Sequence, residues 1–144
     1  MNDFSRYHRQ MLLPTIGEEG QRALAESAVL VAGCGALGTV AADLLARAGV
    51  GTLVIVDRDI VEHTNLQRQT LFTERDAQRG MPKAEAAKTK LSLVNSDVRV
   101  RAFVEDIAPD TIVELAADCD LLLDGLDNFQ TRYLLNDYAV AHGV

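Results

Sequence analysis

A glycine-rich loop is the first part of the sequence whose residue types and spacing could do chemistry. Gly33, Gly35 and Gly38 form a GxGxxG pattern between an apolar run and a helical stretch. Glycines permit a tight turn and a close backbone approach, and free N–H groups at a helix start attract phosphate. Asp57 follows 19 residues after Gly38, where a carboxylate can accept hydrogen bonds from ribose hydroxyls. These residues predict a nucleotide site and leave open whether the nucleotide is NAD, FAD or ATP.

Three further polar residues could contact phosphate. Asn65 and Arg68 are three residues apart, as on one helical turn, and Arg is suited to bidentate contact with phosphate. A dehydrogenase has no evident use for this run, although a polar surface turn would have the same composition. Lys83 falls in the first turn of an expected helix, where the helix dipole disfavours a positive charge, and this favours a functional role.

Asp127 comes just after the predicted strand at 120–124. A carboxylate there could hold a divalent cation, or it could cap a helix beside Asn128. Because the carboxyl ends of parallel strands meet at one edge of a sheet, we expect the glycine loop, Asp57 and Asp127 to converge on one crevice.

The elements that must position these residues follow from the apolar pattern. Continuous apolar runs at 28–32, 52–56 and 120–123 are typical of parallel strands covered on both faces. The alternating run at 98–104 predicts a strand nearer an edge.

Helical stretches lie between the strands. After the glycine loop, and before a stop at Gly49, helical spacing is shown by Leu37, Val40, Ala41, Leu44, Leu45 and Ala48. Pro82 and Pro109 suit the first turns of two more helices, and a last helix closes at Gly143. The alternation predicts an α/β fold, a Rossmann-like doubly wound and mainly parallel sheet with helices on both faces. Val144 resembles the start of another strand, so we expect a domain that is incomplete at its C-terminus.

The composition excludes several classes of protein. A chain of 144 residues, 48% of them hydrophobic, fits one compact domain. The net charge of −7 argues against nucleic-acid binding, and no apolar run reaches the ~20 residues that span a bilayer, so we expect a cytoplasmic protein with neither partner. Cys34 and Cys119 suit reduced thiols, and the chain has too few good ligands for a structural zinc.

Taken together, these motifs resemble the ThiF/MoeB/HesA family, the bacterial relatives of the ubiquitin-activating enzymes. The resemblance rests on residues 6–10, the glycine loop, Asp57 with Asp59, residues 65–69, Pro82-Lys83 and Asp127-Asn128, and it covers essentially the whole chain in order. It implies an ATP-dependent adenylyltransferase that activates the C-terminal Gly-Gly carboxylate of a ubiquitin-like sulfur-carrier protein and releases pyrophosphate. The pathway would be thiamine or molybdopterin biosynthesis, and the sequence does not separate the two.

The resemblance also implies a role for each matching position. The ATP-binding set would be Gly33, Gly35, Ala36, Gly38, Asp57, Asp59, Asn65, Arg68, Gln69, Lys83, Asp127 and Asn128. The catalytic set would be Arg9, Arg68, Lys83 and Asp127, with Asp127 holding Mg²⁺. Ala36 replaces a glycine that several relatives have, which weakens any backbone contact there.

The same resemblance implies a division of the chain and a homodimer. Residues 1–27 would form an N-terminal helical arm whose Arg9 reaches the active site of the other subunit, and residues 28–144 would form the ATP-binding domain. In the family, thioester or persulfide cysteines and any zinc site lie in the half that follows.

Two other functions stay open at this point. An NAD(P)-dependent oxidoreductase would use the same loop and Asp57, but it would leave Asn65, Arg68 and Lys83 without a role. A non-catalytic Rossmann scaffold would keep the fold and bind a partner.

Overall fold

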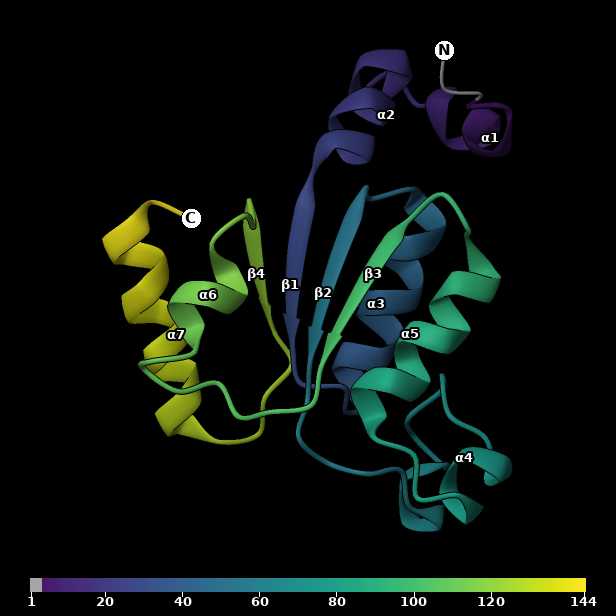
Figure 1. Ribbon diagram of the computed structural model, residues 1–144. Helices are drawn as coiled ribbons and strands as arrows, with labels where there is room; N and C mark the ends of the chain where they lie inside the picture. The colour runs from purple at the N-terminus through teal and green to yellow at the C-terminus, as the bar shows by residue number, and fades with distance from the viewer. Residues whose placement is uncertain (1–3) are drawn as a thin grey trace.

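The computed structural model describes residues 4–144, so the first three residues of the expected arm lie outside the described part. Its centre is a four-stranded sheet in the order β3-β2-β1-β4, in which every pairing is parallel (Figure 1). The strands are β1 (Ala28–Ala32), β2 (Thr52–Val56), β3 (Arg99–Phe103) and β4 (Leu121–Asp124). The predicted doubly wound α/β fold is confirmed.

Helices cover both faces of this sheet (Figure 1). One face carries α3 (Ala36–Ala48) and α5 (Lys83–Val94), and the other carries α6 (Ile112–Ala116) and α7 (Phe129–His142). None of the helices formed by residues 4–144 has the length and apolarity to cross a membrane.

Two hydrophobic cores result, because successive side chains of a strand point to opposite faces. Val29 and Val31 of β1 pack in the core beneath α3 and α5, whereas Leu30 and Ala32 pack in the core beneath α6 and α7. Both central strands are buried from their second residue onward, which explains why their apolar runs were continuous.

The inward face of α3 differs from the expectation. The helix lies where its spacing predicted and ends at Gly49, which has φ +85°. However, its buried residues are Gly38, Thr39, Ala42 and Ala46, whereas Leu37, Val40 and Leu44 are exposed. Small residues face the sheet because the first turn of α3 approaches the glycine loop closely: a Cβ on Gly38 would lie 1.8 Å from the carbonyl oxygen of Gly33.

Several predicted boundaries also need correction. As expected, β4 packs on both faces, through Leu123 in one core and Leu122 in the other, but it is an edge of the described sheet and its Leu121 is 49% exposed. A turn precedes α6, which begins at Ile112 rather than at Pro109. Val144 lies outside any strand, because its N–H bonds back to Ala139 at the end of α7.

Three short helices at the N-terminal end are anchored to the far end of α3: η1 (Ser5–Tyr7), α1 (His8–Met11) and α2 (Gly17–Glu26). The amides of Gln10 and Gln21 both donate to the carbonyl of Ala48. The buried Asn95 donates to the Tyr7 hydroxyl at 2.7 Å and to the Ala46 carbonyl at 2.8 Å. The Ala48 carbonyl therefore finds its partners in this N-terminal region, and Asn95, which follows α5, links Tyr7 to the Ala46 carbonyl.

We predict that Asn95→Ala lowers the free energy of unfolding by about 2–3 kcal/mol, because it removes two buried hydrogen bonds, to the Tyr7 hydroxyl and to the Ala46 carbonyl. Urea unfolding measures this change. Asn136→Ala, on the exposed face of α7, is the control and should change the stability by less than about 0.5 kcal/mol. Equal stabilities of the two variants would contradict the prediction.

Candidate functional site

A groove of about 1140 Å³ lies along the carboxyl ends of the strands. The chain leaves β1 for one face of the sheet, and it leaves the neighbouring β4 for the other face, so the groove sits where ligands bind in open α/β sheets (Figure 1). Of the predicted site residues, those that line the groove are Gly33, Gly35, Ala36, Asp57, Asp59, Asn65, Arg68, Gln69, Lys83, Asp127 and Asn128. Gly38 and Arg9 do not line it.

The three glycines of the loop are needed for different steric reasons. Gly33 has φ +88°, and a Cβ there would lie 2.9 Å from the carbonyl oxygen of Gly125. At position 38, the Gly33 carbonyl leaves no room for a side chain. A Cβ on Gly35, in contrast, would meet nothing within 4 Å. Gly33 and Gly38 are therefore required by packing, whereas Gly35 keeps space open in the groove, as a site for an approaching phosphate requires.

Asp57, at the end of β2, fixes both sides of the loop region. Its Oδ2 accepts a hydrogen bond from the Cys34 N–H at 2.7 Å, and its Oδ1 accepts one from the Asp59 N–H at 2.8 Å. The carboxylate is thus held in position at the groove wall.

Lys83 is held in the wall by Asp59. The Lys83 side chain is only 8% exposed, and its Nζ lies 3.1 Å from Asp59 Oδ2. The Lys83 N–H also donates to the Asp59 carbonyl at 2.8 Å, beside an antiparallel bridge between Ile60 and Pro82. The sequence stretches after β2 and before α5 are therefore joined, which places the lysine beside the glycine loop.

Asn65 and Arg68 lie on a short helix and the turn that follows it, beginning with η2 (His63–Asn65). Asn65 is buried, and its Oδ1 accepts from the Glu62 N–H at 2.9 Å, which leaves its Nδ2 amino group for a ligand oxygen. Arg68 is exposed, and its Nη1 donates to the Thr64 carbonyl at 3.0 Å. Both residues belong to the groove wall, as the predicted single turn required.

A short helix lies in the chain between this turn and Lys83. In α4 (Glu74–Gln78), the Asp76 carboxylate accepts from the Thr73 N–H and hydroxyl and lies 3.5 Å from Lys90. Burial acts to raise the pKa of Asp76, but the Thr73 hydrogen bonds and the Lys90 charge outweigh it and lower the pKa below the usual value. The hydrogen bonds and the ion pair of Asp76 therefore hold the chain segment between Arg68 and Lys83 at its middle.

Asp127 lies between Asp124 and Asn128, whose side chains are both held by hydrogen bonds. Asp124 accepts from the Leu126 N–H at 3.0 Å and from Arg132 Nε at 2.8 Å, and Asn128 caps α7 by accepting from the Thr131 N–H at 2.9 Å. The helix-cap alternative for Asp127 is therefore wrong, because Asn128 is the cap. Asp127 is exposed and makes no hydrogen bond or ion pair with the described residues, so its carboxylate is available to a ligand.

Two parts of the groove, Gly125 and the segment after β3, were not predicted from the sequence. Gly125 packs against the glycine loop, since a Cβ there would lie 3.0 Å from the Gly33 carbonyl oxygen. The segment after β3 forms another wall, in which Asp106 pairs with Arg58 at 3.1 Å. Their position just after a strand, at the same sheet edge, was the signal that could have found them.

Carboxylates outnumber cations along the groove. The acidic residues are Asp57, Asp59, Glu62, Glu105, Asp106 and Asp127, and the basic ones are Arg58, Arg68 and Lys83. Within residues 4–144, no group of three or more His, Cys, Asp or Glu side chains could hold a metal ion. This arrangement fits Mg²⁺, which commonly binds through one or two carboxylates together with the phosphates of its nucleotide.

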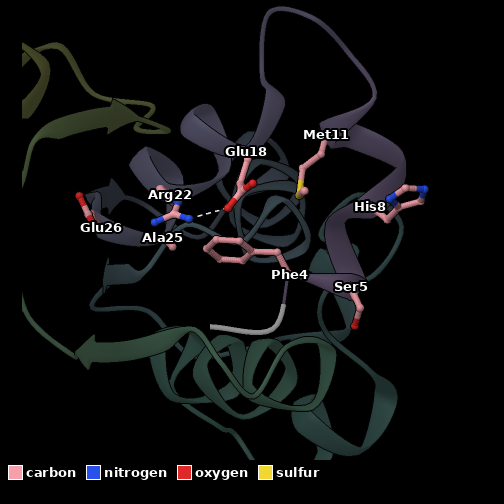
Figure 2. Close-up of a pocket in the computed structure, with 8 residues that line it drawn as sticks. All are labelled: Phe4, Ser5, His8, Met11, Glu18, Arg22, Ala25 and Glu26. Atoms are coloured by element: carbon pink, nitrogen blue, oxygen red, sulfur yellow. Dashed lines mark hydrogen bonds and ion pairs between the residues drawn. The ribbon is translucent and has the colours of Figure 1, made fainter. Parts of the chain in front are cut away.

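The Cys34 thiol and a second hollow are the remaining candidates for a functional site. Burial raises the pKa of the Cys34 thiol to about 12, the charge of Asp57 adds to the effect and Lys83 opposes it, so the thiol stays protonated and is a poor nucleophile. A smaller hollow of about 460 Å³ lies at the N-terminal helices, where Arg22 is already paired with Glu18 (Figure 2).

Arg9 lies in α1, at the end of the sheet opposite to the groove (Figure 1). The 13 residues of α3 separate the two places, which corresponds to about 20 Å along the helix axis. The structure therefore does not bring Arg9 to the groove of its own chain.

Known proteins are similar to this chain in sequence and in fold. The chain is 49% identical over 139 residues to a sulfur carrier protein ThiS adenylyltransferase of Bacillus subtilis, over 96% of this chain and 41% of that protein. It is 44% identical over 141 residues to a sulfur carrier protein adenylyltransferase of Thermus thermophilus, over 98% of this chain and 51% of that protein. The chain thus spans about half of the length of these relatives or less.

Solved structures agree with the fold. The E. coli tRNA N6-threonylcarbamoyladenosine dehydratase TcdA, in complex with ATP, has a TM-score of 0.91 at 25% identity, over 99% of this chain and 58% of that chain. E. coli MccB with ATP has a TM-score of 0.85 at 31% identity, over 95% of this chain and 42% of that chain. Because the ThiF family matches residues 7–144, nearly the whole of the sequence, this chain belongs to the ThiF family.

Proposed function

We propose that this chain binds ATP and, within the working enzyme, adenylates the C-terminal Gly-Gly carboxylate of a ubiquitin-like sulfur-carrier protein. The observation that carries the proposal is that Arg68, Lys83 and Asp127, far apart in the sequence, line one groove with Gly35 and Asp57. Sulfur carrier protein adenylyltransferases among the relatives support it. A nicotinamide-dependent oxidoreductase would give no role to the lysine, the arginine or Asp127.

The reaction needs positioning more than covalent catalysis. A carboxylate oxygen of the carrier attacks the α-phosphorus of ATP, the bond from that phosphorus to the bridging oxygen breaks, and pyrophosphate leaves with the bond electrons. The carboxylate is already the nucleophile, so the protein must align two anions and offset their repulsion. Gly35 leaves room for the phosphates, Asp57 accepts from the ribose, and Arg68 and Lys83 face the developing charge.

Most of the positive charges in the groove are already paired with carboxylates. Lys83 is paired with Asp59, and Arg58 is paired with Asp106, which leaves Arg68 as the described groove cation without a carboxylate partner. When bound, Mg²⁺ would be held by Asp127 and phosphate oxygens and would supply further positive charge. The remaining charge would come from Arg9 of a second subunit.

A homodimer is part of this proposal. Arg9 cannot serve its own groove, because α3 separates the two. Along the outer side of α3, Leu37, Val40 and Leu44 are 72%, 42% and 60% exposed and extend from the groove toward the N-terminal helices. If two chains pair along this stripe in opposite directions, a two-fold contact brings the α1 of each near the groove of the other.

The two kinds of glycine should separate binding from folding. We expect Gly35→Ala to keep the wild-type stability, since its φ of −84° suits alanine and the added methyl group meets no protein atom, but to weaken ATP binding by at least about tenfold. Gly38→Ala should lower the free energy of unfolding by about 3 kcal/mol. Calorimetric titration and urea unfolding measure the two effects. Unchanged ATP affinity in Gly35→Ala would contradict the phosphate role.

The charge roles should appear in catalysis. We expect Lys83→Met and Asp127→Asn each to slow the exchange of labelled pyrophosphate into ATP by about 100-fold, because each removes stabilisation of the transferring phosphates. The assay uses a carrier ending in Gly-Gly, with NADH binding measured beside it. Lys88→Met, an exposed lysine of the same helix as Lys83, is the matched control. Exchange at the control rate in both variants would refute these roles.

The shared site should show complementation. Arg9→Ala and Asp127→Ala subunits are each expected to be inactive as homodimers. Mixed equally, they should recover about a quarter of the wild-type exchange rate, because half of the dimers are mixed and each mixed dimer has one intact site. Verified mixed dimers that stay inactive would argue against a contribution from the second subunit.

A further inference from the structure

Arg9 is an exposed cation whose neighbours in the chain are held by hydrogen bonds. The Arg9 side chain itself makes no hydrogen bond or ion pair with the described residues. Tyr7, two residues before it, is only 6% exposed, and the Tyr7 hydroxyl accepts from Asn95 Nδ2 at 2.7 Å. Gln10, the next residue, donates to the Ala48 carbonyl at 2.8 Å. The backbone that carries Arg9 is therefore anchored on both sides.

The helix α1 depends on these contacts for its place. It has four residues, and isolated helices shorter than about 12 residues are marginal in water. The side chains that hold it in place are fully buried amides, since Asn95 is 1% exposed and Gln21 is 0% exposed. Gln21 accepts from Gln10 and donates to the Ala48 carbonyl. Burial of such amides costs free energy unless they are hydrogen-bonded, and here their partners fix α1.

These anchors lie at the ends of the two helices that also begin at the groove. α3 begins after the glycine loop and α5 begins with Lys83, and both run from the groove toward the N-terminal helices (Figure 1). Ala48 is the last residue of α3, and Asn95 directly follows α5. The place of α1 is thus set by the same rigid elements that form the groove of its own chain.

We infer that Tyr7 and Asn95 are positioning residues, which fix α1 so that Arg9 is presented to the groove of a second subunit. This inference rests on the proposed function. Neither residue lines the groove, so each acts only through the helix that carries Arg9. A guanidinium on an anchored helix loses less conformational freedom when it reaches the transferring phosphates than one on a loose segment, and its geometry is better defined.

The test places Tyr7→Phe in one or the other subunit of mixed dimers of the working enzyme. In a dimer of Arg9→Ala and Asp127→Ala subunits, the Asp127→Ala subunit supplies Arg9 to the single intact groove, which belongs to the Arg9→Ala subunit. We expect Tyr7→Phe in the Arg9-supplying subunit to slow pyrophosphate exchange about fivefold, because one anchoring hydrogen bond is lost. In the other subunit it should leave the rate unchanged.

Tyr7→Phe keeps the ring that packs against the end of α3, where a Cβ on Gly49 would lie 2.5 Å from the ring, so the fold should persist. Tyr133→Phe is the matched control, because Tyr133 is 66% exposed on α7. Gln10→Met removes the anchor on the other side of Arg9, and it should show the same one-sided loss.

A loss of equal size in both placements overturns the inference, because it shows a general effect on the fold. Equal rates of Tyr7→Phe and Tyr133→Phe in the Arg9-supplying subunit also overturn it, and in both cases the proposed function stands. If the mixed dimers without a further substitution recover no exchange, the shared site of the proposed function fails, and this inference fails with it.

Discussion

The groove depends on one carboxylate, that of Asp57. Its two oxygens accept from the backbone of Cys34 and of Asp59, so one side chain at the end of β2 fixes the glycine loop and the segment that holds Lys83. Because each carboxylate oxygen has further lone-pair capacity, the same group can still accept from a ligand hydroxyl. Organising the site and contacting the nucleotide are thus compatible tasks for Asp57.

Close backbone packing is the second constraint. Gly33, Gly38 and Gly125 meet where the ends of β1 and β4 come together, and added methyl groups would lie 1.8–3.0 Å from carbonyl oxygens. This packing also explains which face α3 turns to the sheet: its small residues approach the strands, while Leu37, Val40 and Leu44 are exposed. The requirement for close approach overrides the rule that the larger apolar side chains of a helix are buried.

Much of the fold could be predicted because the signals were local. The runs at 28–32 and 52–56 predicted β1 and β2 with correct bounds, and the carboxyl-edge rule predicted that the glycine loop, Asp57 and Asp127 meet in one groove. The inward face of α3 and the role of Gly125 could not be predicted, since both depend on contacts between distant backbone segments. The capping role of Asn128 was open from the sequence, because Asp and Asn are both good caps.

The excess of carboxylates along the groove has a kinetic consequence. Most proteins that bind anions attract them with positive fields, so added salt slows their association. Here six acidic side chains face three basic ones, two of which are already in ion pairs, so a free nucleotide approaches a region of its own sign. Screening by salt should then speed the encounter, and nucleotide that already carries its cation should enter faster than the bare tetra-anion.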